Sequence, residues 1–167
     1  RISKESCGQL TMGTWLKHDV TTIVNAPLDN VWNTWSDLDS MSLWMSWIES
    51  VKTIDQETST LPDLTEWTLA ANGFKFKWKA QITERIEKNK LKWKSIGGLP
   101  TQGSVIFESK GDQLTSVNLA VTYELPRMIA RFMEEKILGK MVTNELQANI
   151  DRFRDLVEKN YNNESTN

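Results

Sequence analysis

Phe74–Thr83 reads FKFKWKAQIT, and its apolar and polar side chains alternate without a break. Successive side chains of a β-strand point to opposite faces of a sheet, so this spacing predicts a strand with one buried and one solvated face. Leu91-Lys92-Trp93-Lys94 repeats the pattern after a connection at 84–89. The two segments therefore predict an antiparallel hairpin whose aromatic side chains share one face and whose lysines share the other.

Further strands are predicted on both sides of this hairpin. The even-numbered positions from Leu16 to Val24, which include His18 and Thr22, can share one face of a first strand. The other predicted strands cover 51–58, 64–71, 103–109 and 115–124. Gly97-Gly98 separates two of the strands and predicts a bulge or bend in the sheet rather than a phosphate-binding loop.

Helical spacing occurs in two places. After Pro27, which suits the first turn of a helix, two short helices are predicted at 28–35 and 40–47, the second with Leu43, Trp44 and Trp47 inward. After Pro126 the apolar residues recur every three or four positions as far as Val157, which predicts one long amphipathic helix. A glycine at 139 predicts a kink or break in it.

The size and composition limit the possible functions. The 167 residues suit one domain, which we expect at 14–160, with a lead-in at 1–13 and a polar, disordered tail at 161–167. A net charge of −2 argues against binding nucleic acid, which needs excess cations. With one histidine and one cysteine, the chain cannot build a Cys/His zinc cluster or an internal disulfide, and we expect no metal and no cofactor.

No apolar run reaches the roughly 18 residues of a membrane span, and no signal peptide is visible. We therefore expect a cytoplasmic protein, with peripheral membrane attachment as an alternative. The sequence begins with Arg1, so an upstream targeting segment stays open.

The order of elements, together with several local motifs, resembles the polyketide cyclase/dehydrase and lipid-transport family of the START and pollen-allergen superfamily. Coenzyme Q-binding proteins are a related branch. The motifs that carry the resemblance are Asn25-Ala26-Pro27 with Val31-Trp32, Trp35-Ser36-Asp37 with Trp44 and Val51, Leu91–Gly98 with Gly103–Phe107, and Leu146 with Phe153 and Glu158. The resemblance implies an α+β helix-grip fold, in which a curved antiparallel sheet of about seven strands wraps around the C-terminal helix.

The resemblance also implies a cavity between sheet and helix that binds or transports an apolar small molecule, such as a lipid, an isoprenoid, a prenylquinone or an aromatic polyketide. The predicted wall residues are Phe76, Trp78, Trp93, Phe107, Val121 and Tyr123. The predicted lid residues are Trp44, Trp47, Met128, Phe132 and Met133. For any one of the aromatic side chains, ordinary core packing is the alternative, because burying a Trp contributes about 4–6 kcal/mol by itself.

A cyclase or dehydratase that acts on a polyketide-like or aromatic intermediate is the alternative function. Tyr123 or an arginine would then donate a proton, but the sequence shows no complete catalytic set, which favours a binding protein. His18 has no carboxylate partner in the sequence pattern and is interpreted as structural or exposed. We expect a monomer or weak dimer, and a transient membrane contact at the lid is a further hypothesis.

Overall fold

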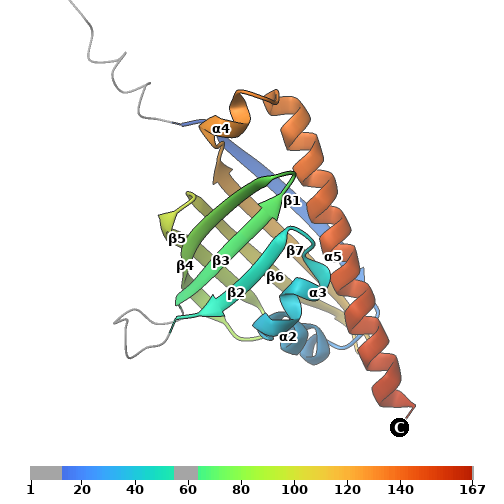
Figure 1. Ribbon diagram of the computed structural model, residues 1–167. Helices are drawn as coiled ribbons and strands as arrows, with labels where there is room; N and C mark the ends of the chain where they lie inside the picture. Colours follow the sequence, from blue (N-terminus) through green and yellow to red (C-terminus); the bar gives the residue numbers. More distant parts are fainter. Residues whose placement is uncertain (1–12, 55–63, 167) are drawn as a thin grey trace, which may run out of the picture.

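The computed structural model describes residues 13–54 and 64–166. Within them the chain forms a seven-stranded antiparallel sheet in the order β1-β7-β6-β5-β4-β3-β2, with one long helix across its concave face (Figure 1). The strands are β1 Trp15–Val24, β2 Ile48–Thr53, β3 Leu64–Ala71, β4 Phe74–Ile86, β5 Lys90–Gly98, β6 Thr101–Gly111 and β7 Leu114–Glu124. The helices are α2 Leu28–Ser36, the 3-10 turn η1 Leu38–Ser40, α3 Met41–Trp44, α4 Arg127–Ala130 and α5 Glu135–Ser165. The predicted helix-grip fold is confirmed.

The hairpin of β4 and β5 forms as its alternation predicts. The lysines at 75, 77, 79, 92 and 94 are exposed on the outer face. The aromatic residues Phe74, Phe76 and Trp78 point inward but stay only half-buried. At the end of β5, Gly98 has φ +83°, and the register with β4 shifts between Lys79 and Ala80, so the predicted bulge is confirmed.

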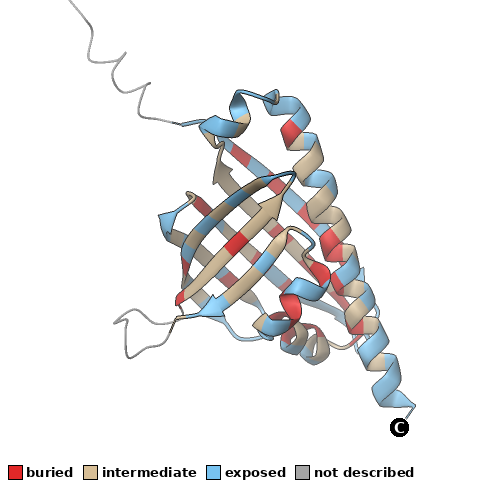
Figure 2. Ribbon diagram, in the orientation of Figure 1, coloured by how far each residue is buried: buried red, intermediate tan, exposed pale blue. Residues whose placement is uncertain are grey.

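The hydrophobic core occupies one end of the concave face, where α2 and α3 meet the second half of α5 (Figure 2). Its aromatic centre is a cluster of Trp35, Trp44 and Phe153, with ring centroids 5.0 to 5.2 Å apart. Ile150 and Val157 extend the same stripe of α5 into this core. The second half of α5 is therefore packed directly on the sheet.

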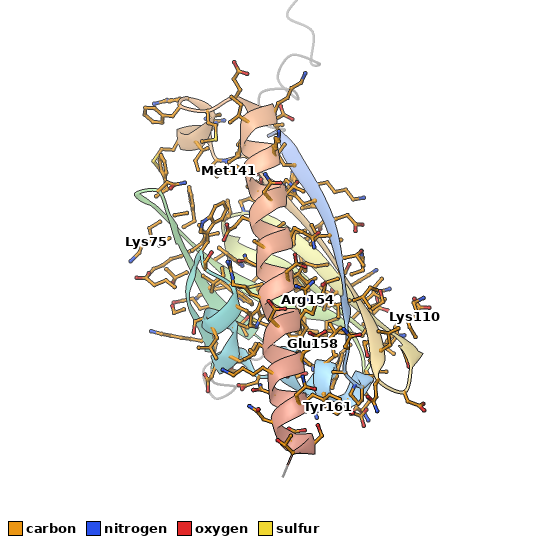
Figure 3. The ribbon with its side chains drawn as sticks, turned by 90° about the vertical axis from the view of Figure 1, so that its right-hand side faces the viewer. Lys75, Lys110, Met141, Arg154, Glu158 and Tyr161 are labelled. Carbon is orange, nitrogen blue, oxygen red and sulfur yellow. The ribbon has the colours of Figure 1, made fainter. Side chains whose placement is uncertain are left out.

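Helix α5 runs beside β1 in the side view (Figure 3), and hydrogen bonds join it to β1 and to the residue that follows β1. Thr143, Asp151 and Glu158 lie on one stripe of the helix and meet His18 Nδ1 at 2.8 Å, the Thr22 hydroxyl at 3.1 Å and the Asn25 backbone N–H at 2.8 Å. These contacts fix the rotation of α5, and hence which of its side chains face the sheet.

Four expectations about the helices differ from the structure. The second short helix ends at Trp44 instead of Trp47, because the backbone carbonyl of Trp47 accepts a hydrogen bond from the Ala70 backbone N–H and so joins the edge of the sheet. Leu43 was predicted to point inward, but its side chain is 69% exposed. The break in the C-terminal helical segment falls at 131–134, because Phe132 and Met133 close a turn on the carbonyl of Ile129.

Gly139 lies inside α5 without a break. The helix also continues to Ser165, so 161–165 is helical and not a tail, with Tyr161 packed against the core. The lead-in, apart from Gly13, the part of the predicted 51–58 strand beyond residue 54, and Asn167 lie outside the described residues. In the part of the chain that the structure describes, no helix is long and apolar enough to cross a membrane.

Candidate ligand cavity

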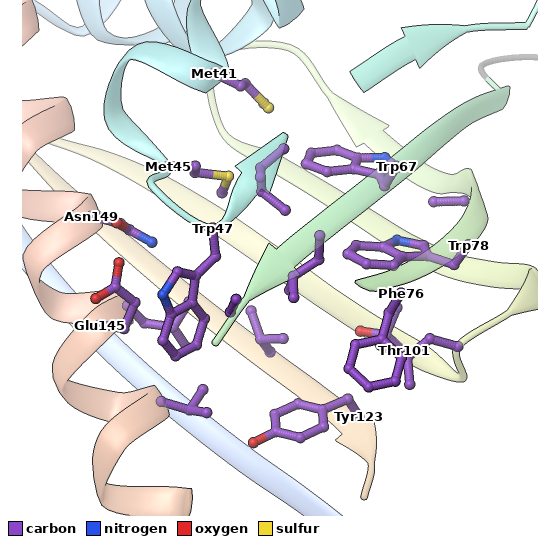
Figure 4. A pocket seen from close by; sticks show the side chains of 18 of the residues that line it. Met41, Met45, Trp47, Trp67, Phe76, Trp78, Thr101, Tyr123, Glu145 and Asn149 are labelled. Atoms are coloured by element: carbon purple, nitrogen blue, oxygen red, sulfur yellow. The ribbon is translucent and has the colours of Figure 1, made fainter. Parts of the chain in front are cut away.

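A cavity of about 400 Å³ lies between the concave face of the sheet and the first half of α5 (Figure 4). It occupies the end of the concave face that the hydrophobic core leaves free. The core at Ile150, Phe153 and Val157 holds the second half of α5 on the sheet, whereas inward side chains of the first half line the cavity. Its volume lies within the range of about 300 to 1,000 Å³ that is typical of small-molecule sites.

The sheet side of the cavity is aromatic. Trp67 on β3 and Trp78 on β4 are direct cross-strand partners, and their rings stack in parallel at a centroid distance of 6.0 Å and an angle of 6°. Trp93 on β5 lies over Gly103 on β6, where an added Cβ would stand 2.5 Å from Trp93 Cζ2. The missing side chain of Gly103 thus gives the Trp93 ring its place in the wall.

The helix side of the cavity is apolar with two polar positions. The residues of α5 that line it are Leu138, Met141, Val142, Glu145, Leu146 and Asn149. Their spacing of three and four places them on one helical face. The sequence predicted Met141, Val142 and Leu146 as part of an amphipathic helix but did not assign them to a site, because periodicity shows which face is inward and not whether a cavity lies beneath it.

The mouth is formed where the α4–α5 connection approaches the turn between β3 and β4. Phe132 and Met133 line the cavity from this connection, and the Phe132 ring lies 6.4 Å from that of Phe74. Phe132 is nevertheless 78% exposed. One aromatic side chain therefore both contacts the cavity rim and projects outward.

Eight of the eleven predicted site residues line this cavity: Phe76, Trp78, Trp93, Val121, Tyr123, Trp47, Phe132 and Met133. Trp44 and Phe107 instead lie in the core, each 1% exposed, because Trp44 packs on Phe153 and Phe107 packs edge-on against Trp32 and Trp35. Met128 on α4 is 54% exposed and is not among the lining residues. The sequence missed Trp67, which only the pairing of β3 with β4 identifies, because it places Trp67 opposite Trp78.

A hydrogen-bonded chain reaches the cavity wall at Tyr123. The Tyr123 hydroxyl lies 3.1 Å from His18 Nε2, and His18 Nδ1 lies 2.8 Å from the Thr143 hydroxyl. The His18 and Tyr123 rings are parallel, with centroids 5.4 Å apart. Burial lowers the pKa of His18 and raises the pKa of Tyr123 to about 12, so both groups are neutral near pH 7.

A second polar group lies where α5 faces the segment between α3 and β2. Glu145 accepts a hydrogen bond from the Ser46 hydroxyl and lies 3.4 Å from Arg152 Nη2, and Arg152 also donates to Asn149 Oδ1. Arg152 Nε donates to the Trp44 carbonyl at 3.2 Å. These contacts hold α3 against α5 and satisfy the charge of Glu145.

The described residues contain no group of three or more acidic, histidine or cysteine side chains that could hold a metal ion. What the cavity offers chemically is a large apolar and aromatic surface with a neutral hydroxyl at Tyr123.

Comparisons with known proteins agree with this architecture. Residues 24–144 match the family described as polyketide cyclase/dehydrase and lipid transport. An uncharacterized 17.2 kDa protein of Streptomyces lincolnensis, from the melC2–rnhH intergenic region, is 28% identical over 137 residues, which cover 81% of this chain and 85% of that protein.

Two solved structures share the fold. A START superfamily protein of Mycobacterium smegmatis has a TM-score of 0.71 at 12% identity and covers 86% of this chain and 98% of its own. The Zhui aromatase/cyclase of Streptomyces sp. R1128 has a TM-score of 0.69 at 13% identity, and the match covers 87% of this chain and 95% of that chain. The chain belongs to the polyketide cyclase/dehydrase and lipid transport family, because its match to that family spans most of its length.

Proposed function

We propose that this protein binds and carries an apolar small molecule, such as a lipid, an isoprenoid, a prenylquinone or an aromatic polyketide, in the cavity between sheet and α5. The observation that carries the proposal is the stacked pair of Trp67 and Trp78 in the wall of a 400 Å³ cavity. Aromatic faces of this kind bind flat or chain-like apolar molecules through dispersion and burial of surface.

The energetics of the cavity support the same proposal. At about 24 cal/mol per Å³, leaving an apolar cavity of this size empty would cost on the order of 10 kcal/mol, which is comparable with the whole stability of a domain. Water would fill such a cavity with little gain in free energy, because the apolar wall offers few polar groups for hydrogen bonds. An apolar ligand restores the lost contacts.

The first test is native mass spectrometry of the gently purified protein, with an organic extract of the same sample analysed beside it. We expect a stoichiometric apolar compound, provided that the expression host makes it. Titration calorimetry with that compound then compares Val121→Trp, which fills the cavity from β7, with the control Ile106→Trp on the outer face of the sheet. The cavity variant should lose at least about tenfold in affinity and the control little; equal affinities would place the ligand elsewhere.

A cyclase or dehydratase is the second candidate function. The observation that favours it is the hydrogen-bonded pair of His18 and Tyr123 at the cavity wall, which can pass a proton to a bound molecule. A carrier returns its extracted compound unchanged after incubation, whereas a dehydratase returns a product that has lost water. Liquid chromatography with mass spectrometry before and after incubation separates the two functions, because a cyclised isomer of unchanged mass is detected by its changed retention time.

A transient membrane contact at the mouth is part of the carrier proposal. Met128, Phe132 and Ile137 are all more than half exposed around the α4–α5 connection. The exposed charged residues of the same segment are the cations Arg127, Arg131 and Lys136 and the anions Glu134 and Glu135, which leaves an excess of one positive charge. Apolar side chains flanked by cations suit an anionic lipid surface. Vesicles that contain phosphatidylserine should float the wild-type protein and release the Phe132→Ala variant, whereas absence of wild-type binding at low salt would refute this contact. In this proposal the protein works in the cytoplasm as a monomer or weak dimer.

A further inference from the structure

The hydroxyl of Tyr123 is held at the cavity wall by groups from two other elements. His18 comes from β1, the strand next to β7, and Thr143 comes from α5. His18 is only 5% exposed, yet both of its ring nitrogens have a partner, at 2.8 Å and 3.1 Å. The imidazole is thus fixed, and it fixes the position of the Tyr123 oxygen in turn.

The surroundings of Tyr123 are uncharged. Thr101, its direct partner on β6, already donates its own hydroxyl proton to the Thr122 carbonyl at 3.1 Å. Of the charged residues that line the cavity, Glu145 is engaged by Ser46 and Arg152. Arg85 lies toward the other end of the strands, paired with Leu91, which itself pairs with Val105 on β6.

The hydrogen-bond directions along the chain of groups depend on one another. A neutral imidazole has one N–H and one bare nitrogen. When the Thr143 hydroxyl donates to Nδ1, the proton resides on Nε2 and is donated to the Tyr123 oxygen. The Tyr123 O–H is then free to donate into the cavity.

We propose that Tyr123, supported by His18 and Thr143, is a hydrogen-bonding site for the carbonyl oxygen of an otherwise apolar ligand, as in a ketone or quinone. The inference rests on the proposed function and names the ligand class within it. A carbonyl oxygen accepts hydrogen bonds and donates none, so it matches the O–H that the Nε2-protonated tautomer of His18 leaves free. Tyr123 is a binding residue in this proposal, and His18 and Thr143 are positioning residues.

The neutrality of the site favours a carbonyl over a carboxylate. Burial keeps the Tyr123 hydroxyl protonated and the His18 ring uncharged, so no cation at this wall compensates an anion. A carboxylate would lose its hydration here without a charged partner, whereas a ketone oxygen needs only one donor.

The test uses acetylnaphthalene and isopropenylnaphthalene, which have the same shape but carry C=O and C=CH₂ respectively. Calorimetry measures both affinities for the wild type, for Tyr123→Phe, and for the control Tyr161→Phe, which alters the other tyrosine of the chain. We expect Tyr123→Phe to weaken the ketone roughly threefold to tenfold, the worth of one net hydrogen bond, and to leave the hydrocarbon within about twofold. The control should change neither affinity.

The supporting residues have their own readout. His18 is the chain's one histidine, so nitrogen NMR of its ring gives a single pair of signals. Adding the ketone should place the ring proton on Nε2. Thr143→Val should lower both the fraction of His18 that carries its proton on Nε2 and the affinity for the ketone. Thr143→Ser should restore both, because the serine hydroxyl can still donate a hydrogen bond to Nδ1.

The outcomes separate the two proposals. Loss of ketone affinity alone in Tyr123→Phe supports the carbonyl site. Equal losses for both molecules, no loss, or a ring proton that stays on Nδ1 in the ketone complex would overturn it while hydrocarbon binding still supports an apolar carrier. If the wild type binds neither molecule, the carrier function itself fails and the carbonyl site with it.

Discussion

The ring of Phe132 lies 6.4 Å from the ring of Phe74, and this contact joins the α4–α5 connection to the start of β4 across the cavity mouth. Phe74 belongs to the sheet, whereas Phe132 projects from a short irregular segment between two helices and is 78% exposed. Phe132 therefore contacts the rim of the mouth while most of its side chain is exposed, so we expect it to move without disturbing the core.

Phe132→Ala should speed the exchange of ligand and leave the fold intact. An exposed side chain contributes little to stability, so we expect the free energy of unfolding to change by less than about 0.5 kcal/mol. Stopped-flow dissociation of N-phenylnaphthylamine, a neutral apolar fluorophore, should be several-fold faster. The matched control is Leu43→Ala, a 69% exposed apolar residue on α3; the same acceleration in both variants would refute the role of Phe132 at the mouth.

Phe107→Ala and Trp78→Ala should separate core from cavity wall. Phe107 is 1% exposed and packs against Trp32 and Trp35, so its truncation should cost about 3–5 kcal/mol. Trp78 already faces the cavity on one side, and its loss should cost less than about 2 kcal/mol while weakening ligand binding. Urea unfolding of the unliganded variants measures both costs. Equal costs would mean that Trp78 is ordinary core.

The Tyr123 hydroxyl should ionise late in an alkaline titration. Burial raises its pKa to about 12 from the ordinary value of 10.0. In the Tyr161→Phe variant Tyr123 is the remaining tyrosine, and tyrosinate absorbance should rise with a midpoint near 12. Because the unfolded chain loses this proton first, the stability linked to Tyr123 is fully present below pH 10 and is lost as the pH rises toward 12. A midpoint near 10 would show an exposed hydroxyl.

The stability of the protein should fall as the pH decreases through the range where a free histidine takes up a proton. Burial lowers the pKa of His18 below 6.5, so as the pH falls the unfolded chain takes up the proton first. Proton binding then stabilises the unfolded state relative to the folded state. The slope can reach about 1.4 kcal/mol per pH unit. Thermal unfolding between pH 7 and 5.5 should show this slope in the wild type and a weaker one in His18→Gln. Identical slopes would place a solvated, chargeable imidazole at this position.

Strand β4 and helix α5 show how much of the fold could be predicted from the sequence alone. The alternation at Phe74–Thr83 fixes which side chains of β4 point inward, because side-chain direction in a strand has a strict period of two. The stepwise apolar residues after Pro126 likewise predict an amphipathic helix. Both patterns are local, and the helix-grip fold was predicted only once the order of the elements and the local motifs were compared with a known family.

The position of the cavity, in contrast, does not follow from local sequence patterns. An inward-pointing side chain either packs on a neighbour or faces empty space, and the two have the same local pattern. Phe107 and Trp78 both occupy inward positions of strands, yet Phe107 meets Trp32 and Trp35 from α2 while Trp78 faces the cavity. The position of α2 and α3 at one end of the sheet makes that difference.

By itself, the sequence determined the alternation of the strands, the amphipathic face of the last helix and the order in which they follow one another, since each depends on residues close together in the chain. The tertiary structure alone decided that Trp67 stands opposite Trp78 and that His18, Tyr123 and Thr143 meet. The residues of the latter site are separated by as many as 125 positions. Only the pairing of β1 with β7 and the rotation of α5 on β1 bring them within hydrogen-bonding distance.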